Sequence, residues 1–458
     1  MNMKKLLIAV VALAVQAAQA EVKIVEPVEG AVVPLLTEPQ KAYVKMPHDE
    51  RIKKFAEDDF RHKVMGLPAE VVEGVERQLY WPKTVKLAWT AKPGAAAKVS
   101  VRDVKKNVSV FEATATNGVA YVDNLEIAAE YAWTVSADGE TGSSTFRTED
   151  LAPRLIRFPG VPNVRDLGGR IGLGGKRIRQ GMLIRSAGLN NNASNVYFTK
   201  DELRASGKLA EHEAKAAAAK PRLEQLLAWQ KDMTTFDRED PEFKNWCKRH
   251  PGDLPAKFLK ERIDRARKTV ERGENPRIVK ETLPGKSRVE GERGEYIRAR
   301  FGIKTDIDLR SKWECEGMTG SPLGPTVKWV HVPSSSYERM QSKGAREQFA
   351  TTFRVLLDKA NYPVVFHCIA GQDRTGAVAF ILNALLGVDE DQLYLDWEET
   401  GFTNHGHQFC HERLFDKLVK GFNDSFPAPT LRESAEKYVL ACGFTKEDIE
   451  TFRGIMLE

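Results

Sequence analysis

The chain has 458 residues, enough for two or three domains, and a formal net charge of +5, which is too mild to predict nucleic-acid binding. Five cysteines give no disulfide framework in a chain of this length. Beyond the first twenty residues, no segment of the sequence is long and apolar enough to span a bilayer. Composition therefore favours a folded protein of more than one domain.

Residues 1–20 have the pattern of a secretory signal peptide. A charged start (Lys4 and Lys5), an apolar run (6–15) and a small-residue end (18–20) follow one another. The pattern predicts an exported mature chain, periplasmic or secreted, whose net charge falls from +5 to +3 with the loss of two lysines. A membrane anchor is the alternative, but the apolar run is short for a spanning helix and no cysteine follows the cut for lipidation.

Residues 21–150 are predicted to form an all-β domain. Turns rich in Gly, Asn, Asp and Pro separate short runs of strand-forming residues at 85–89, 98–101, 118–122 and 131–135. Leu125 followed by Tyr131 resembles the tyrosine corner of fibronectin type III and immunoglobulin-like domains, and Trp89 resembles their core tryptophan. We expect a β-sandwich that serves as a spacer, as a protein or glycan contact module, or in a purely structural role. Residues 50–77 fit this pattern less well and suggest a helical excursion.

A helical insertion is predicted at about 190–295. Residues 210–219 are strong helix formers, and residues 258–272 are rich in Lys, Arg and Glu. Between 241 and 300 the sequence has 17 Lys and Arg against 10 Asp and Glu. A solvated helical face explains this excess; the alternative is a lid or rim that attracts anionic substrates.

The run His367–Gly376 predicts a phosphate-binding loop. The apolar residues 363–366 before it are typical of a buried strand, and residues 375–386 have the apolar density of a buried helix. A loop that closes onto a helix N-terminus directs several backbone N–H groups into one concavity, where an anion is favoured. Gly371 and Gly376 allow the turn. No Gly-Lys-Ser/Thr is present, so the loop is not of the Walker type.

Cys368 opens this loop and Arg374 closes it. The guanidinium can hold two phosphate oxygens while the sulfur faces phosphorus, and the same positive surroundings stabilise a thiolate. Attack by the thiolate gives a phosphocysteine intermediate that water hydrolyses, which divides one displacement into two easier ones. Thr375 is placed to donate its hydroxyl to the departing sulfur, and His367 is interpreted as support behind the loop. The phosphate-binding backbone is expected to come from Ile369, Ala370, Gly371, Gln372, Asp373 and Arg374. Neither a metal nor another cofactor is required by this chemistry.

The loop resembles the signature of the cysteine-based protein tyrosine phosphatases. Three further segments resemble the bacterial branch of that family, whose members include dual protein and phosphoinositide phosphatases: Asn163–Gly169, Arg185–Leu189 and Asp306–Ser311. The stretch 435–454 fits its closing helices. The resemblance implies an α/β domain over 151–458, with a central, mainly parallel sheet flanked by helices and interrupted by the insertion.

The resemblance also implies protein-tyrosine phosphatase activity, which makes a phosphorylated protein or a small phosphomonoester the expected substrate. Gln372 departs from the lysine that members acting on phosphoinositides often carry, and this lowers the expectation for polyphosphorylated lipids. A phosphoinositide or inositol-phosphate phosphatase is the first alternative. A phospho-binding pseudophosphatase or a surface interaction protein is the second.

Three carboxyl groups are candidates for the general acid that protonates the leaving oxygen. Asp373 matches an aspartate implicated in catalysis in the family branch, and its alternative role is a salt bridge to Arg374. Asp166 resembles another aspartate associated with the family's active site, and its alternative role is a turn carboxylate that caps backbone N–H groups. Glu338 follows the predicted strand 327–332, where related enzymes carry an acid-bearing mobile loop; its alternative is a solvated surface residue.

The remaining cysteines leave a redox question open. They are Cys247, Cys315, Cys410 and Cys442. In an oxidising compartment they could pair, and buried free thiols are the alternative.

Overall fold

The computed structural model describes residues 22–55, 82–250, 255–402 and 412–458. These residues form two compact units: a first unit of residues up to 191, 286–314 and 318–458, and a second unit of residues 192–285 and 315–317. The predicted signal peptide at 1–20, most of the excursion at 50–77, and Cys410 lie outside the described residues. No helix among the described residues has the length and apolar character needed to cross a membrane.

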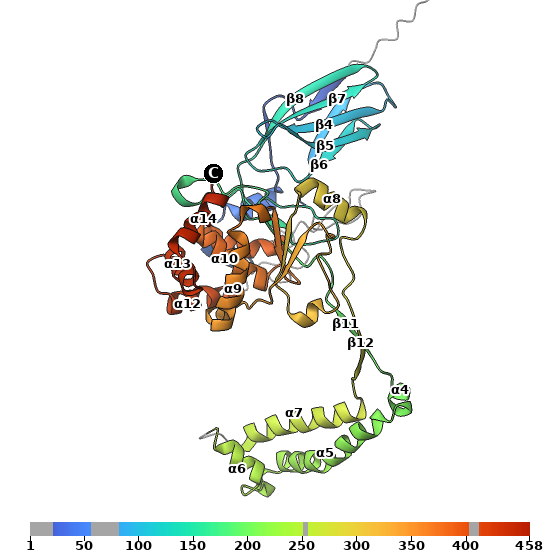
Figure 1. The fold of residues 1–458 in the computed structure, drawn as a ribbon, viewed down its shortest axis with the longest axis vertical. Helices are drawn as coiled ribbons and strands as arrows, with labels where there is room; N and C mark the ends of the chain where they lie inside the picture. The colour runs from blue at the N-terminus through green and yellow to red at the C-terminus, as the bar shows by residue number, and fades with distance from the viewer. Residues whose placement is uncertain (1–21, 56–81, 251–254, 403–411) are drawn as a thin grey trace, which may run out of the picture. The chain divides into compact units, whose positions relative to one another are not determined.

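The N-terminal part of the first unit is built from two β-sheets. Its strands are β1 (Lys23–Glu26), β2 (Ala31–Val33), β3 (Val85–Thr90), β4 (Ala97–Asp103), β5 (Val108–Ala115), β6 (Val119–Val122), β7 (Glu130–Ala137) and β8 (Glu140–Thr148). The sheet orders are β1-β3-β6 and β2-β8-β7-β4-β5, and every pair except the parallel pair β2 and β8 is antiparallel. Figure 1 labels β4, β5, β7 and β8 of the larger sheet and β6 of the smaller one. The four strand runs predicted from the sequence lie within or overlap β3, β4, β6 and β7.

Buried residues alternate with more exposed ones along these strands, and the buried residues of the two sheets form a shared apolar core. In β4 and β7 every second residue is buried, which is the pattern of a sheet with one face covered. Trp89 and Trp133 are buried in this core. The Tyr131 hydroxyl accepts a hydrogen bond from the backbone N–H of Glu126 at 2.9 Å, the kind of contact that a tyrosine corner makes. The likeness to fibronectin type III domains stays a prediction.

Two short helices follow β2 and pack on the C-terminal part of the chain. They are α1 (Glu38–Val44), which starts with a capping box at Thr37, and α2 (His48–Phe55). The fully buried Arg51 donates to Glu398 at 2.5 Å and to Asp391 at 3.0 Å, and the Tyr43 hydroxyl donates to Glu398 at 2.8 Å. The segment between β2 and β3 is therefore hydrogen-bonded to residues 391–398 of the same unit.

The remainder of the first unit is an α/β domain around a five-stranded sheet. Its strands, in the order β14-β13-β15-β10-β9, are β14 (Lys328–His331), β13 (Thr305–Asp308), β15 (Val364–His367), β10 (Leu183–Ser186) and β9 (Arg165–Asp166). The first four are parallel and only β9 is antiparallel, as a mainly parallel sheet requires. All residues of β10, β13 and β15 are buried, because helices and connecting segments cover both faces of a parallel sheet.

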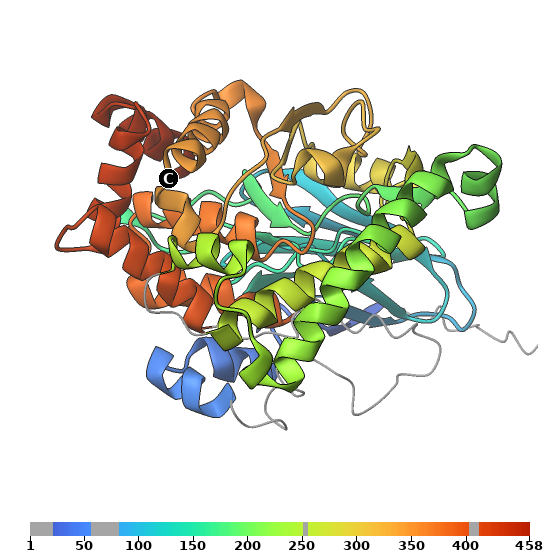
Figure 2. The ribbon, with the colours of Figure 1, turned by 90° about the horizontal axis from the view of Figure 1, so that it is seen from below.

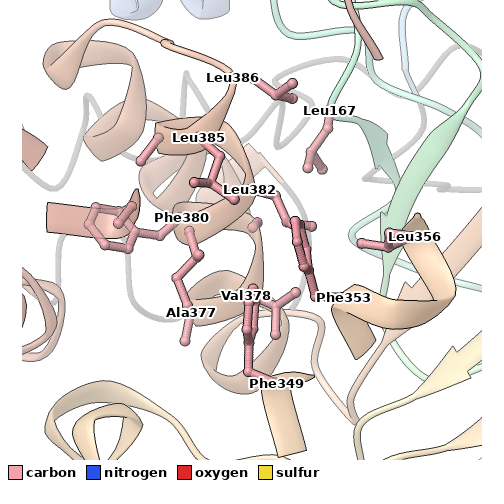
Figure 3. Close-up of a cluster of buried hydrophobic side chains, with 14 of the residues drawn as sticks. Leu167, Phe349, Phe353, Leu356, Ala377, Val378, Phe380, Leu382, Leu385 and Leu386 are labelled. Atoms are coloured by element: carbon pink, nitrogen blue, oxygen red, sulfur yellow. The ribbon is translucent and has the colours of Figure 1, made fainter. Parts of the chain in front are cut away.

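Helices of the C-terminal region gather around α10 (Figures 1 and 2). The helical elements are η1 (Leu173–Gly175), α8 (Glu292–Phe301), η3 (Lys312–Cys315), η4 (Tyr337–Gln341), α9 (Lys343–Leu356), η5 (Lys359–Asn361), α10 (Asp373–Leu385), α11 (Glu390–Glu398), η6 (Glu399–Phe402), α12 (Glu412–Ser425), α13 (Leu431–Ala441) and α14 (Lys446–Met456), where η denotes a 3-10 helix. From Thr375 on, every residue of α10 is buried and all but Thr375 and Asn383 are apolar, so this helix lies at the centre of the core. Figure 3 shows its side chains against Leu167, Phe349, Phe353 and Leu356.

The second unit contains a two-stranded ribbon and a helical hairpin. Its elements are β11 (Ser194–Tyr197), α4 (Lys200–Ala205), α5 (Lys208–Lys231), η2 (Met233–Thr235), α6 (Pro241–Cys247), α7 (Pro255–Glu274) and β12 (Val279–Leu283). Helices α5 and α7 lie side by side (Figure 1). A Cβ atom at Gly273 would meet the Ala216 Cβ at 2.5 Å, so the small residues of the predicted alanine-rich helix permit close packing. The antiparallel ribbon was not predicted: its exposed strands carry little apolar alternation.

Candidate active site

The phosphate-loop candidate begins where the central strand β15 ends. His367 is the last residue of this strand, Cys368 follows it with 1% of its surface exposed, and α10 begins at Asp373. Gly371 has a φ of +68°, and a Cβ atom there would meet the Ser186 carbonyl oxygen at 2.4 Å. Only glycine fits this turn, because the backbone is left-handed and touches the neighbouring strand. The predicted strand, loop and helix are thus confirmed.

Two side chains from outside the loop hold its backbone. The Asn163 amide donates to the Ala370 carbonyl at 2.8 Å, and Arg185 donates to the Gly371 carbonyl at 2.7 Å. In a trans peptide the carbonyl and the next N–H point in opposite directions. Because these two carbonyls are turned towards Asn163 and Arg185, the N–H groups of Gly371 and Gln372 point away from those residues.

Asn163 and Arg185, which make these two contacts, are connected to a buried ionic network. It consists of Arg165, Arg170, Arg185, Asp396 and Glu399, all exposed by no more than 3%. Asp396 pairs with Arg185 and lies 3.4 Å from Arg165, which also donates to the Asn163 side chain, and Arg170 lies 2.6 Å from Glu399. The network connects the helical segment 396–399 to the backbone of the loop, and its three cations exceed its two carboxylates.

The two carboxyl groups of this network have pKa values displaced in opposite directions. Burial alone would raise the pKa of Asp396, but Arg185, Arg165 and Arg170 outweigh it and lower that pKa to about 2. Burial, together with the neighbouring Asp396 charge, raises the pKa of Glu399 despite Arg170. Asp396 is therefore ionised at neutral pH and supplies a negative charge to the network.

Arg374 is held by a residue that sequence reasoning missed. Its Nη1 and Nη2 atoms lie 2.5 and 3.0 Å from the two oxygens of Glu314, a bidentate pair. The backbone N–H and hydroxyl of Ser311 donate to the same carboxylate at 2.7 and 2.5 Å. Burial opposes ionisation of Glu314, but hydrogen bonds from Arg374 and Ser311 lower its pKa to about 2. The Ser-x-x-Glu spacing of a capping box was the available sequence signal.

His367 lies behind the loop and faces two carboxylates of the neighbouring strand. It is fully buried, with Nε2 3.0 Å from Asp306 and Nδ1 3.9 Å from Asp308. Burial would lower the pKa of His367, but Asp308 and Asp306 outweigh it and raise that pKa. The structure thus gives His367 partners on strand β13, and its role in supporting the loop stays a prediction.

The candidate acid Asp373 contacts a tyrosine rather than the loop arginine. The Tyr337 hydroxyl, from η4, donates to the Asp373 carboxylate. Tyr337 has a φ of +54°, an uncommon backbone conformation for a residue other than glycine. In the described part of the chain Arg374 forms its ion pair with Glu314, so the alternative role of Asp373 as the partner of Arg374 is not what the structure has.

Asp166, the second candidate acid, is fully buried at the end of strand β9. One oxygen accepts the Gly168 N–H at 2.8 Å; the other accepts the Gly181 N–H at 2.5 Å and pairs with Arg154 at 2.9 Å. Burial raises the pKa of Asp166 against the effect of Arg154. These contacts favour the alternative of a turn carboxylate that caps backbone N–H groups.

The other predicted site residues lie at or near the loop. Thr375 is fully buried in the first turn of α10, and its hydroxyl makes no hydrogen bond within the described residues. Gln372 precedes α10 and is 5% exposed. Glu338 belongs to η4, one residue after Tyr337, but its side chain lies outside the described part of the structure.

A sequence model of a tyrosine phosphatase family matches residues 156–203 and 286–458. The matched stretches contain the loop that carries Cys368 and Arg374, and they omit residues 204–285. The match supports a tyrosine phosphatase family, and with it a phosphatase, for this part of the chain. No curated protein matches the chain.

Proposed function

We propose that the protein hydrolyses phosphomonoesters, above all phosphotyrosine in proteins, through a phosphocysteine intermediate. The observation that carries this proposal is the placement of Cys368 and Arg374 at the two ends of a loop between the central strand and the central buried helix. Loop N–H groups and the N-terminus of α10 provide fixed positive partial charges for a phosphate dianion. The family match supports the phosphatase class.

In the first chemical step the Cys368 thiolate attacks phosphorus in line with the ester oxygen. A sulfur–phosphorus bond forms, the phosphorus–oxygen bond breaks, and the leaving oxygen takes a proton from an acid. Arg374 holds two phosphate oxygens and stabilises the charge of the transition state. Its bidentate contact with Glu314 fixes the plane of the guanidinium before substrate binds, which lowers the entropy lost on binding.

Asp373 is the acid that the geometry favours over Asp166. Both oxygens of Asp166 are engaged by backbone N–H groups and Arg154, whereas Asp373 starts α10 at the loop itself. The Tyr337 hydroxyl fixes one oxygen of Asp373. In the second step water attacks the phosphocysteine and gives its proton to the Asp373 carboxylate, and the Thr375 hydroxyl donates to the departing sulfur.

Export and a contact role for the N-terminal sheets complete the proposal. The signal pattern at 1–20 supports periplasmic or secreted placement. The N-terminal sheets carry no candidate catalytic group and are proposed as a module that contacts protein or glycan. A role of the insertion as a basic lid stays a prediction.

The mature protein should be assayed with matched phosphotyrosine and phosphoserine peptides, inositol phosphates and phosphoinositides, with and without a chelator. We expect the highest kcat/KM on phosphotyrosine, and turnover that the chelator leaves unchanged, because a thiolate and an arginine need no metal. Rapid acid quenching should trap labelled phosphate on the peptide containing Cys368. Chelator-sensitive turnover, or a preference for phosphoinositides, would contradict the proposal.

Replacing Asp373 by Asn should slow good and poor leaving groups unequally. Acid catalysis is typically worth about 100- to 10,000-fold, and a leaving group that departs readily needs less of it. We therefore expect kcat for a phosphotyrosine peptide to fall by about 100-fold or more, and kcat for an activated aryl phosphate to fall much less. Glu338→Gln is the matched variant of the other loop candidate, and we expect it to change both rates by less than about twofold. Equal losses on both substrates in the Asp373 variant would exclude Asp373 as the acid.

A further inference from the structure

A buried arginine from the N-terminal part of the chain holds helix α11. Arg51, in α2, is fully buried and lies outside the stretches 156–203 and 286–458 that the family model matches. Its Nε donates to Glu398 at 2.5 Å, and its Nη1 and Nη2 donate to the two oxygens of Asp391 at 3.1 and 3.0 Å. Asp391 and Glu398 are about two helical turns apart, so both lie on one face of α11. One arginine thus holds α11 near both of its ends.

The segment around Arg51 also shares an apolar cluster with the same part of the chain. Buried residues from 36–44 and 395–402 form this cluster: Leu36, Tyr43, Val44, Leu395 and Phe402. The rings of Tyr43 and Phe402 meet edge to face with centroids 5.6 Å apart, and the Tyr43 hydroxyl donates to Glu398 at 2.8 Å. Because apolar and ionic contacts act on the same short stretch, residues 36–51 fix the position of Glu398.

The residue two positions before Glu398 is connected to the backbone of the phosphate loop. Asp396 pairs with Arg185, and Arg185 donates to the Gly371 carbonyl at 2.7 Å. A series of direct contacts therefore leads from Arg51 through α11 to the loop.

Trp397, between Asp396 and Glu398, packs beside the candidate acid. Trp397 is buried, and a Cβ atom at Gly376 would meet its ring at 2.4 Å, so the indole lies against the first turn of α10. The rings of Trp397 and Tyr337 meet edge to face with centroids 5.6 Å apart. The Tyr337 hydroxyl in turn donates to the carboxylate at the start of α10. The end of α11 is therefore in contact with the residue that fixes this acid.

We propose that Arg51 is a positioning residue of the candidate active site, which acts through Glu398 on the phosphate loop and on Asp373. The inference deepens the proposed function and rests on it. Consecutive residues of a helix share one backbone, so a displacement of Glu398 also displaces Asp396 and Trp397. A misplacement of about 1 Å can lower the rate of a reaction about 100-fold, even when the change lies far from the reacting atoms. A residue from outside the matched stretches thus sets the geometry inside them.

Arg51→Met and Arg453→Met test this role as a matched pair. Arg453 is also buried and donates to two carboxylates, Glu436 and Glu450, and to the Leu385 carbonyl at the end of α10 remote from the loop. Both variants should lose stability. At a temperature at which circular dichroism shows both variants folded, we expect only Arg51→Met to lower kcat/KM for a phosphotyrosine peptide and the affinity for inorganic phosphate, each about tenfold.

A double variant tests the route through Glu398. Glu398→Gln should lower kcat/KM by a similar factor. The combined variant Arg51→Met/Glu398→Gln should lose no more than about twofold beyond the larger single loss, because both changes break the same contact. Losses that multiply in the combined variant would overturn the route through Glu398.

Hydrogen exchange in the wild-type protein gives a readout that does not depend on whether a variant folds. Coupling between two sites is reciprocal, so if release of α2 weakens phosphate binding, bound phosphate must strengthen the packing of α2. Saturating inorganic phosphate should therefore slow amide exchange in residues 48–55 about tenfold, the same factor as the loss of phosphate affinity. Exchange in the strand β5 at 108–115 is the internal control and should not change.

The outcomes separate this inference from the proposed function. Equal kinetics and phosphate affinities in Arg51→Met and Arg453→Met would give Arg51 a structural role only and overturn the inference, and so would exchange in α2 that phosphate leaves unchanged. Both results leave the proposed function standing. A wild-type protein that binds phosphate but hydrolyses no phosphomonoester contradicts the proposed function alone, because phosphate affinity and hydrogen exchange still measure the positioning role.

Discussion

Cys368→Ser is expected to abolish turnover of phosphomonoesters, with a loss in kcat of about 10,000-fold or more. Serine keeps the shape of the side chain but supplies no thiolate, so the covalent intermediate cannot form at a useful rate. Binding of phosphate and phosphopeptide should persist, because the loop N–H groups and Arg374 are unchanged. Steady-state kinetics and calorimetric titration with phosphate measure the two quantities on one preparation.

A second cysteine provides the matched control for this prediction. Cys442 is half-buried at the C-terminal end of α13 and belongs to no part of the loop. Burial raises the pKa of the Cys442 thiol to about 12, so this thiol is not an available nucleophile near neutral pH. Cys442→Ser should change kcat by less than about twofold. Turnover that survives in Cys368→Ser would place the nucleophile elsewhere.

Asp396→Asn is expected to lower the free energy of unfolding by about 3–5 kcal/mol at neutral pH, the usual range for removal of one partner of a buried ion pair. The amide has nearly the same shape, but it leaves the buried Arg185 and Arg165 without their shared negative charge. Arg185 also holds the Gly371 carbonyl, so kcat/KM should fall together with stability. Urea denaturation with an unchanged m value measures the first effect, and steady-state kinetics measures the second.

The difference in free energy of unfolding between wild type and Asp396→Asn should depend on pH, because it follows the ionisation of Asp396. The pKa of Asp396 is lowered from 3.8 to about 2 in the folded protein, so the stabilisation by this carboxylate is fully present above about pH 4 and is lost as the pH falls towards 2. The stability difference between wild type and Asp396→Asn should narrow over the same range. Asp424→Asn, which breaks an exposed pair with Lys420, should change stability by less than about 1 kcal/mol at any pH. If the stability difference between wild type and Asp396→Asn stayed constant down to pH 2, the ionised Asp396 carboxylate would not be its cause.

The segment 163–169 shows how a recognisable motif can differ in role from what its residue types suggest. Sequence reasoning treated Asp166 as a candidate proton donor. In the folded chain Asn163 and Arg165 connect the loop to the buried network, and Asp166 closes a turn with Gly168, Gly181 and Arg154. This motif therefore supports the backbone of the proposed phosphate-binding loop.

The residues of the loop could be predicted because their chemistry is local. A strand, a glycine turn and an apolar helix within some twenty residues specify the cradle, and Cys368 and Arg374 lie within six positions of each other in the sequence. Helices such as α5, α7 and α10 were likewise predicted from their own composition. The ribbon of β11 and β12 was not, since two short exposed strands far apart in sequence carry no strong period of their own.

The supporting residues were decided by contacts between distant parts of the chain. Glu314 lies 60 positions from Arg374, and Asp396 lies 211 positions from Arg185, so no spacing in the sequence pairs them. The sequence by itself was enough to propose Cys368 as nucleophile and Arg374 as the phosphate-binding residue, and it predicted the phosphatase class that the family match supports, because these inferences depend on residue types a few positions apart. Only the tertiary structure decided which charges hold the loop and which carboxylates are engaged by backbone N–H groups and arginines, because both depend on burial and on partners from other elements.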